Sequence, residues 1–173
     1  MQLVECNLVE HGGAILEILN DAILSSTALY DYAPREPASM TGWFAAKQLG
    51  QIPVWGAVDV HGGLLGFATY GTFRPFPAFK YSVEHSVYVR LGERGRGVGK
   101  ALMQRLIESA KAQQYHVMVG AIDAANEASV AFHQRLGFEH SGTVRQAGFK
   151  FGRWLDLAFY QLLLPTPHAP LDG

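Results

Sequence analysis

The stretch YSVEHSVYVRLGERGRGVGKALMQR, residues 81–105, predicts a strand, a glycine-rich turn and the start of a helix in direct succession. From Tyr81 to Val89, apolar and β-branched residues recur with near period-2 spacing, which is typical of a strand. Gly95, Gly97 and Gly99 then allow the backbone to turn tightly and to approach a ligand. Apolar side chains follow at helical spacing and predict one buried helix face: Val98, Leu102, Leu106, Ile107 and Ala110.

The turn has the features of a phosphate-binding site. The backbone N–H groups at a helix start have no partner within the helix and lie at the positive end of its dipole, so they attract anions. Arg94, Arg96 and Lys100 add positive charge beside the glycines. The strand before the turn carries a carboxylate, Glu84. We therefore expect a phosphorylated ligand to bind next to a strand that offers a candidate base.

Two common nucleotide-binding loops do not fit the turn. In a Walker A loop, Arg94 would stand where the first glycine belongs, and Ala101 would replace the magnesium-binding hydroxyl. A dinucleotide fingerprint would need glycine where the chain has Lys100. A merely flexible connection is the remaining alternative to a phosphate site.

Composition predicts one soluble globular domain. The chain has 173 residues, enough for a full core, and 49% of them are hydrophobic. We expect a single domain over residues 1–164 and a proline-rich flexible tail over residues 165–173. A formal net charge of -1, with no basic stripe, predicts no nucleic-acid partner.

Cysteine and hydropathy patterns predict a cytoplasmic protein without metal. Cys6 is the single cysteine, so no internal disulfide is possible, and no Cys/His cluster has zinc spacing. The sequence lacks a signal-peptide pattern and any apolar run of membrane-spanning length, so we expect no membrane association.

The remaining segments alternate between strand and helix patterns, which predicts an α/β fold with one central sheet flanked by helices. The expected strands are residues 1–9, 53–60, 64–70, 81–89, 116–122, 138–141 and 154–164. The expected helices are residues 12–25 and 40–49, the helix after the glycine turn, and one that Asn126 caps and Gly137 ends.

Two loops are candidates for a binding pocket. The segment SSTALYDYAPREPAS, residues 25–39, is rich in aromatics and prolines, so it could line a pocket or pack on the core. In GTFRPFPAF, residues 71–79, Arg74 lies between aromatics and prolines. That rigid setting suits a guanidinium that binds an anion, although a solvated surface arginine is equally compatible with the pattern.

Two motifs resemble those of the GCN5-related N-acetyltransferases, the GNAT family. Residues 94–99, RGRGVG, resemble the family's Arg/Gln-x-x-Gly-x-Gly/Ala turn, which holds the pyrophosphate of acetyl-coenzyme A. Residues 126–138 resemble its closing motif Asn-x-x-Ala/Ser-x-x-x-Tyr-x-x-x-Gly-Phe, with His133 where the tyrosine usually stands.

Within the family, residues 12–164 resemble the phosphinothricin and methionine sulfoximine/methionine sulfone acetyltransferases. FKYSVEHSVYV, residues 79–89, and KFGRWLD, residues 150–156, carry this resemblance. The chain departs from the subgroup around ALYDYAP, residues 28–34, and at Phe73, where tryptophan is usual.

The resemblance implies a GNAT fold: one mixed, mostly antiparallel sheet with a splayed strand and a glycine-rich pyrophosphate loop. It also implies acetyl-CoA as co-substrate and a homodimer. The residues expected to bind acetyl-CoA are Val87, Tyr88, Val89, Arg94, Gly95, Arg96, Gly97, Val98, Gly99, Lys100 and Asn126.

The expected chemistry is direct attack of an amine on the thioester in a ternary complex. Backbone N–H groups of residues 87–89 could stabilise the oxyanion if a splay frees them. Glu84 is the candidate base, directly or through one water, and His133 the candidate acid for the leaving thiolate. Cys6 is a poor candidate for a covalent carrier.

Arg74 is the best candidate partner for a substrate carboxylate, with Pro75, Phe76 and Ser86 assisting. Glu84 would also face the substrate, and His85 is either a substrate contact or a packing residue. Lys150 or Arg153, from this chain or a partner, could supply a second cation.

The predicted function is N-acetylation, for detoxification, of the α-amine of methionine sulfoximine, methionine sulfone, phosphinothricin or a related amino acid. Two alternatives stay open: the same chemistry on a polyamine or a protein N-terminus, and a non-catalytic acyl-CoA-binding module. A polyamine site should carry an acidic patch, whereas the acceptor-side segments offer Arg74 and Lys80.

Overall fold

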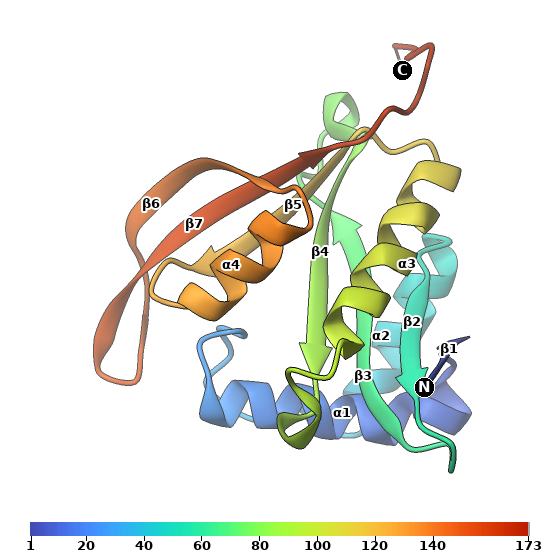
Figure 1. Cartoon of the computed structure of the whole chain (residues 1–173), viewed down its shortest axis with the longest axis vertical. Coiled ribbons are helices and arrows are strands. Elements are labelled where there is room, and N and C mark those ends of the chain that lie inside the picture. Colours follow the sequence, from blue (N-terminus) through green and yellow to red (C-terminus); the bar gives the residue numbers. More distant parts are fainter. Residues whose placement is uncertain (173) are drawn as a thin grey trace. The chain divides into compact units, whose positions relative to one another are not determined.

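The computed structural model describes residues 1–172. Its elements, drawn in Figure 1, are β1 (Gln2–Glu5), α1 (Leu8–Ser25), α2 (Ser39–Leu49), β2 (Val54–Val58), β3 (Leu64–Thr72), η1 (Pro77–Phe79), β4 (Ser82–Val89), η2 (Leu91–Glu93), α3 (Val98–Ala112), β5 (Val117–Asp123), α4 (Glu127–Arg135), β6 (Glu139–Lys150) and β7 (Arg153–Leu163). Within the described residues, no helix combines the length and apolar character that a membrane span requires.

The strands are hydrogen-bonded in the order β1-β2-β3-β4-β5-β7-β6. The pair β4–β5 is parallel, and the pairs β1–β2, β2–β3, β5–β7 and β6–β7 are antiparallel. This mixed, mostly antiparallel sheet with flanking helices confirms the predicted fold class.

The chain divides into two compact units. The first contains Met1–Tyr70 and Ser86–Ser109, and the second contains Gly71–His85 and the residues from Ala110 onward. β4 contributes its first half to the second unit and its second half to the first. The single domain expected over residues 1–164 stays a prediction.

In the first unit, helices cover both faces of the strands. α1 and α2 pack over the face that carries Val54 and Phe67, in a core that includes Ile15, Leu19 and Met40. Trp55 points to the other face, because side chains alternate along a strand. There its indole Nε1 donates to Ser109 Oγ of α3 at 2.9 Å. Figure 1 shows α3 in front of the strands of this unit and α2 behind them.

In the second unit, the long β6–β7 hairpin visible in Figure 1 is the main departure from the sequence prediction. The expectation of a short strand at residues 138–141 was wrong, since β6 runs for 12 residues. Most of its side chains are exposed, so β6 has no apolar alternation for a pattern search to detect. Its pairing with β7 determines its length instead.

Helix α1 also starts earlier than expected, at Leu8 rather than near residue 12. Asn7 caps it, because its side-chain oxygen accepts from Glu10 N at 2.9 Å. The exposed Leu8 and Val9 at the start of the helix do not contribute to the buried face. The apolar periodicity therefore marked only the part of α1 that packs against the sheet.

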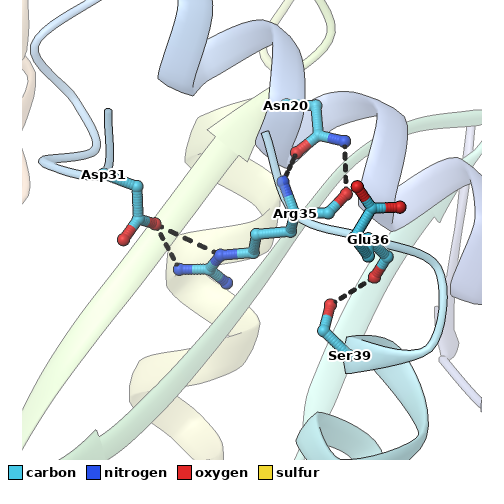
Figure 2. A network of polar contacts seen from close by, with 5 residues as sticks. All are labelled: Asn20, Asp31, Arg35, Glu36 and Ser39. Atoms are coloured by element: carbon cyan, nitrogen blue, oxygen red, sulfur yellow. Dashed lines mark hydrogen bonds and ion pairs between the residues drawn. The ribbon is translucent and has the colours of Figure 1, made fainter. Parts of the chain in front are cut away.

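The loop between α1 and α2 is held from its C-terminal end, as Figure 2 shows. The Asn20 side chain accepts from Arg35 N at 2.7 Å and donates to Arg35 O at 3.0 Å. The Arg35 guanidinium in turn contacts Asp31 at 2.8 Å. Of the loop's aromatics, Tyr32 is 74% exposed, whereas Leu29 packs against the core. Packing of the whole aromatic segment on the core is thus not observed.

The C-terminal tail makes defined contacts within the second unit. Thr166 Oγ1 donates to Tyr115 O at 2.5 Å. The Tyr81 hydroxyl accepts from Leu171 N at 3.0 Å and lies 3.3 Å from Leu171 O. The expected flexibility of residues 165–173 stays a prediction.

Candidate active site

The glycine turn in the first unit has the backbone geometry that a phosphate cradle requires. Gly95 and Gly97 have φ values of 77° and 83°, in the left-handed region that favours glycine. A side chain added at either residue would meet no atom within 4 Å, so space next to the turn is open. Ala101 N donates to Gly97 O, which is the first hydrogen bond of α3. The N–H groups of the residues between them lie at the start of the helix, where the backbone offers them no acceptor within the helix.

The cations around the turn are exposed, as a cradle for a polyanion would require. Arg94, Arg96 and Lys100 are all exposed to solvent. Arg96 also forms a 2.5 Å ion pair with Glu93, which orients its guanidinium next to the turn. Val98, the apolar residue between the glycines, is buried and anchors the turn to the unit.

The parallel ladder between β4 and β5 ends early. It pairs Ser82, Val83 and Glu84 with Val117, Met118 and Val119, whereas β4 itself continues to Val89. The backbone of the rest of β4 therefore lies outside this ladder, which agrees with the predicted splayed strand. Val87, Tyr88 and Val89 fall in this part, and the Tyr88 ring packs against Phe67, 5.4 Å between centroids. Any contact of Tyr88 with a thioester would come from its backbone.

In the second unit, Asn126 caps α4. Its side-chain oxygen accepts from Ser129 N at 3.1 Å, so its amide NH₂ group is the part that can donate to a ligand. The turn before it is fixed by Asp123, whose backbone oxygen accepts from Asn126 N at 2.8 Å. The buried Asp123 carboxylate binds Arg153 at 2.6 Å and Ala125 N at 3.1 Å.

Glu84 and Arg74 interact electrostatically in the second unit. Burial raises the pKa of Glu84, and the positive charge of Arg74 offsets part of that rise. The two side chains form no ion pair within 4 Å among residues 1–172. The Glu84 carboxylate is therefore half-buried and more basic than a solvated one, which suits a proton acceptor.

A pocket of about 260 Å³ lies in the same unit and includes Arg74 in its wall. The strand registers put Ser82, Val117, Val119 and Gln161 on the sheet face that Glu84 also occupies. Aromatic rings close the pocket: Phe73, Phe79 and Phe159. The Arg74 guanidinium lies 4.8 Å from the Phe73 ring centroid, which restrains it at the pocket wall. Pro75 and Phe76 continue this segment, and the Phe76 side chain is exposed.

His85 and His133 meet on the opposite face of β4. Their rings stack with centroids 5.0 Å apart, and the two Nε2 atoms are 3.1 Å apart. His133 Nδ1 lies 2.7 Å from the backbone oxygen of Ser129. Phe138 contacts both rings edge-on at 5.3 Å. His85 is thus a packing residue in this structure, one of the two roles that the sequence left open for it.

Burial favours the neutral form of both histidines. Burial, and secondarily the charge that His133 can carry, lowers the pKa of His85 to about 3. Burial also lowers the pKa of His133, against the opposing effect of the Ser129 backbone oxygen. His133 was predicted to face the leaving thiolate as an acid, but both of its ring nitrogens contact protein atoms here.

The candidate second cations have protein partners in this unit. Arg153 is held by the buried Asp123. Lys150 is buried, and its ammonium lies 5.0 Å from the Phe151 ring centroid. Their proposed contact with substrate stays a prediction.

Sequence reasoning missed the histidine pair and the residue that makes room for it. A Cβ at Gly120 would lie 2.7 Å from His85 Nε2 and 3.4 Å from His133 Nε2. The three residues come from β4, β5 and α4, so no local spacing relates them. A glycine inside the otherwise apolar run of β5 was the available signal, because such glycines often mark a close approach.

The pH dependence of stability tests the buried state of the pair. Below pH 6.5 the unfolded chain protonates its histidines, whereas the folded chain keeps His85 neutral down to about pH 3. Each proton bound only by the unfolded state lowers the unfolding free energy by ~1.4 kcal/mol per pH unit. We expect stability to be complete above pH 6.5 and to fall as pH drops from 6.5 toward 3, measured by urea unfolding.

The control is His85→Met, which keeps a buried side chain and removes one titrating group. Its unfolding free energy should depend less steeply on pH over the same interval. Equal slopes for the two proteins would contradict the neutral, buried state of His85.

Comparison with known proteins identifies the family of the chain. Residues 16–138 match the model of the acetyltransferase (GNAT) family. The chain is 52% identical over 157 residues to an L-methionine sulfoximine/L-methionine sulfone acetyltransferase of Pseudomonas paraeruginosa, covering 90% of this chain and 91% of the relative. It is 34% identical to a phosphinothricin N-acetyltransferase of Streptomyces coelicolor, covering 85% and 87%.

A solved structure gives the same result at the level of the fold. It is a GNAT superfamily phosphinothricin acetyltransferase from Sinorhizobium meliloti in complex with acetyl-CoA, 33% identical, with a TM-score of 0.92. The match covers 99% of this chain and 94% of that one. Since the family model spans most of the chain and the relatives match nearly all of it, the protein belongs to the GNAT family and is an acetyltransferase.

Proposed function

We propose that the protein transfers acetyl from acetyl-CoA to the α-amine of a small amino acid of the methionine sulfoximine, methionine sulfone or phosphinothricin type. The observation that carries this proposal is the combination, in one unit, of a half-buried basic carboxylate and a pocket with an arginine in its wall. An α-amino acid offers an amine for the first group and a carboxylate for the second. The names of the relatives support the same acceptor class.

For acetyl-CoA, the proposed pyrophosphate site lies in the first unit. The pyrophosphate would lie on the N–H groups of the turn that runs from Gly95 to Gly99, with Arg94, Arg96 and Lys100 neutralising its charge. The Asn126 amide would donate to the pantetheine arm. Support comes from the left-handed glycines, the open space beside them and the acetyl-CoA bound in the solved relative from Sinorhizobium meliloti.

In the proposed reaction Glu84 takes one proton from the substrate ammonium, directly or through a water. The free amine then attacks the thioester carbonyl, and backbone N–H groups of Val87, Tyr88 and Val89 stabilise the oxyanion. This attack forms the carbon–nitrogen bond, and collapse of the tetrahedral intermediate restores the carbonyl and breaks the carbon–sulfur bond. The second amine proton goes to the departing thiolate. Because the amine attacks the thioester directly, no acetyl-enzyme forms. Cys6 is buried and its pKa is raised to about 12, which suits no nucleophilic role.

For His133 we propose an indirect part in protonating the thiolate. Its ring nitrogens contact Ser129 and His85, so the group of this cluster that can reach a ligand is the half-buried Ser129 hydroxyl, 3.5 Å from His133 Nδ1. Ser129 would hydrogen-bond the leaving sulfur while His133 orients it.

The homodimer, the cytoplasmic location and the absence of nucleic-acid, membrane and metal partners are also proposals. Aromatic side chains at the turn of the β6–β7 hairpin support self-association, because Phe149, Phe151 and Trp154 are 46%, 58% and 58% exposed. A role in detoxification rests on the nature of the proposed acceptors.

An acceptor panel tests the proposal. We expect saturable release of CoA thiol from acetyl-CoA with methionine sulfoximine, methionine sulfone or phosphinothricin, and much weaker release with spermidine. Turnover on spermidine alone would contradict the anionic acceptor. If the protein binds acetyl-CoA but releases no thiol with any acceptor, a non-catalytic acyl-CoA-binding module would be the better description of its function.

Glu84→Gln should lower kcat by roughly 10²–10⁴-fold at neutral pH, the usual contribution of a general base. The loss should shrink at alkaline pH, where the substrate amine deprotonates without help. Acetyl-CoA affinity, measured by calorimetry, should be unchanged. Glu139→Gln, on exposed β6, is the charge-matched control. A pH–rate profile identical to that of the unaltered protein would exclude Glu84 as the base.

Arg74→Ala should raise the KM for the amino acid by roughly 10–100-fold, since a hydrogen bond to a charged group contributes about 1.5–3 kcal/mol. The KM for acetyl-CoA should stay the same. Lys80→Ala, six residues further along the same segment, controls for the general loss of positive charge. A raised KM for acetyl-CoA with a normal KM for the amino acid would overturn the assignment.

A further inference from the structure

The buried contact between two histidines restricts where their protons can be. Three groups of the second unit form a series of successive contacts: the Ser129 backbone oxygen, the His133 ring and the His85 ring. Ser129 O lies 2.7 Å from His133 Nδ1, and the two Nε2 atoms are 3.1 Å apart. The last atom of the series is His85 Nδ1, which is buried and has no hydrogen-bond partner among residues 1–172.

The direction of each hydrogen bond follows from the chemistry of its ends. A carbonyl oxygen can only accept, so His133 must carry a proton on Nδ1. A neutral His133 then has a lone pair on Nε2, and the facing nitrogen of His85 must be the donor. This arrangement puts the single proton of His85 on Nε2 and leaves its Nδ1 as an unpartnered acceptor.

We propose that His85 is a positioning residue for His133: the His85 Nε2–H donates to His133 Nε2, keeping His133 neutral with its ring proton on the side of Ser129. If His133 were protonated at Nε2, His85 would have to accept that hydrogen bond. His85 Nε2 would then carry the lone pair, and the ring proton of His85 would be on Nδ1. A donor would then be buried without a partner in an apolar setting, which is costly. The donor from His85 therefore opposes protonation of His133.

Within the part of the chain that the structure describes, the elements packed around the pair offer it a glycine and apolar rings. β5 contributes Gly120, whose missing side chain admits both rings. α4 and the residue that follows Gly137 contribute apolar rings, Phe132 at 5.2 Å from His133 and Phe138 at 5.3 Å from each histidine. On β4 itself, Glu84 points to the opposite sheet face. The titratable group that acts on His85 is His133.

The consequence for catalysis rests on the proposed function. If His133 positions Ser129 near the leaving sulfur, it does so through its Nδ1–H, which donates to the Ser129 backbone oxygen at 2.7 Å, while the hydroxyl that would reach the sulfur lies 3.5 Å from Nδ1. Without the His85 donor, His133 Nε2 can bind a proton, or the His133 ring can turn. His85 would then influence turnover without touching the substrate.

The test is nitrogen-15 NMR of the full chain labelled at histidine, followed through a pH titration. The spectrum of the unaltered protein should show His133 protonated only on Nδ1 and His85 only on Nε2. Both rings should stay neutral from pH 8 to below the ordinary histidine pKa of about 6.5. In His85→Met, His133 should gain a titration midpoint at higher pH.

Two further variants separate the role of the donor from packing. His85→Gln can restore an N–H donor near the position of Nε2, so it should return His133 to the neutral form and recover kcat relative to His85→Met. Phe138→Leu removes ring contacts and leaves the hydrogen bond, so the proton positions should not change. A proton on His133 Nε2 in the unaltered protein, or a His133 titration identical in His85→Met, would overturn the proposal.

These readouts do not depend on turnover. Should His85→Met fail to fold, the spectra of the unaltered protein and His85→Gln still decide where the protons lie. If the protons lie as expected but His133→Phe keeps full activity, the proposed catalytic role of His133 fails and the positioning by His85 stands.

Discussion

Successive side chains of β4 point to opposite faces of the sheet, and this alternation separates two ionisable neighbours, Glu84 and His85. Glu84 shares a face with the residues that line the pocket, and it stays half-buried near the charge of Arg74. The His85 ring is buried on the other face, where it packs against His133 of α4. A shift of the strand by one residue would exchange the two environments and destroy both.

β4 can serve both purposes because its pairing with β5 is short. The ladder ends at Glu84 and Val119, so the backbone that follows lies outside it. Gly120 comes next on β5 and leaves room for two imidazoles. The end of the ladder, the base candidate and the histidine pair thus depend on a few consecutive residues of two strands. The proposed base and a buried polar contact thus come from the same piece of sheet.

The glycine turn was predictable because its chemistry is local. Alternating glycines, adjacent cations and an amphipathic helix occur within residues 94–110, and the left-handed conformations of Gly95 and Gly97 are properties of the backbone there. The cap at Asn126 was predictable for the same reason, since the N–H that its side chain accepts from belongs to Ser129, only three residues further along the chain. The length of β6 was not predictable, because an exposed strand has no pattern apart from that of its partner.

The sequence by itself determined the resemblance to the family, the glycine turn before α3 and the order of helices and strands, and it predicted Glu84 and Arg74 as acceptor-side residues. These follow from spacings of a few residues, which the backbone converts directly into turns, caps and strand faces. Only the tertiary structure decided the partners of His133, Asp123 and Arg153, because their contacts join β4, β5, α4 and β7. Burial, which favours the neutral form of the two histidines, arises when those elements pack together and cannot be read from any one of them.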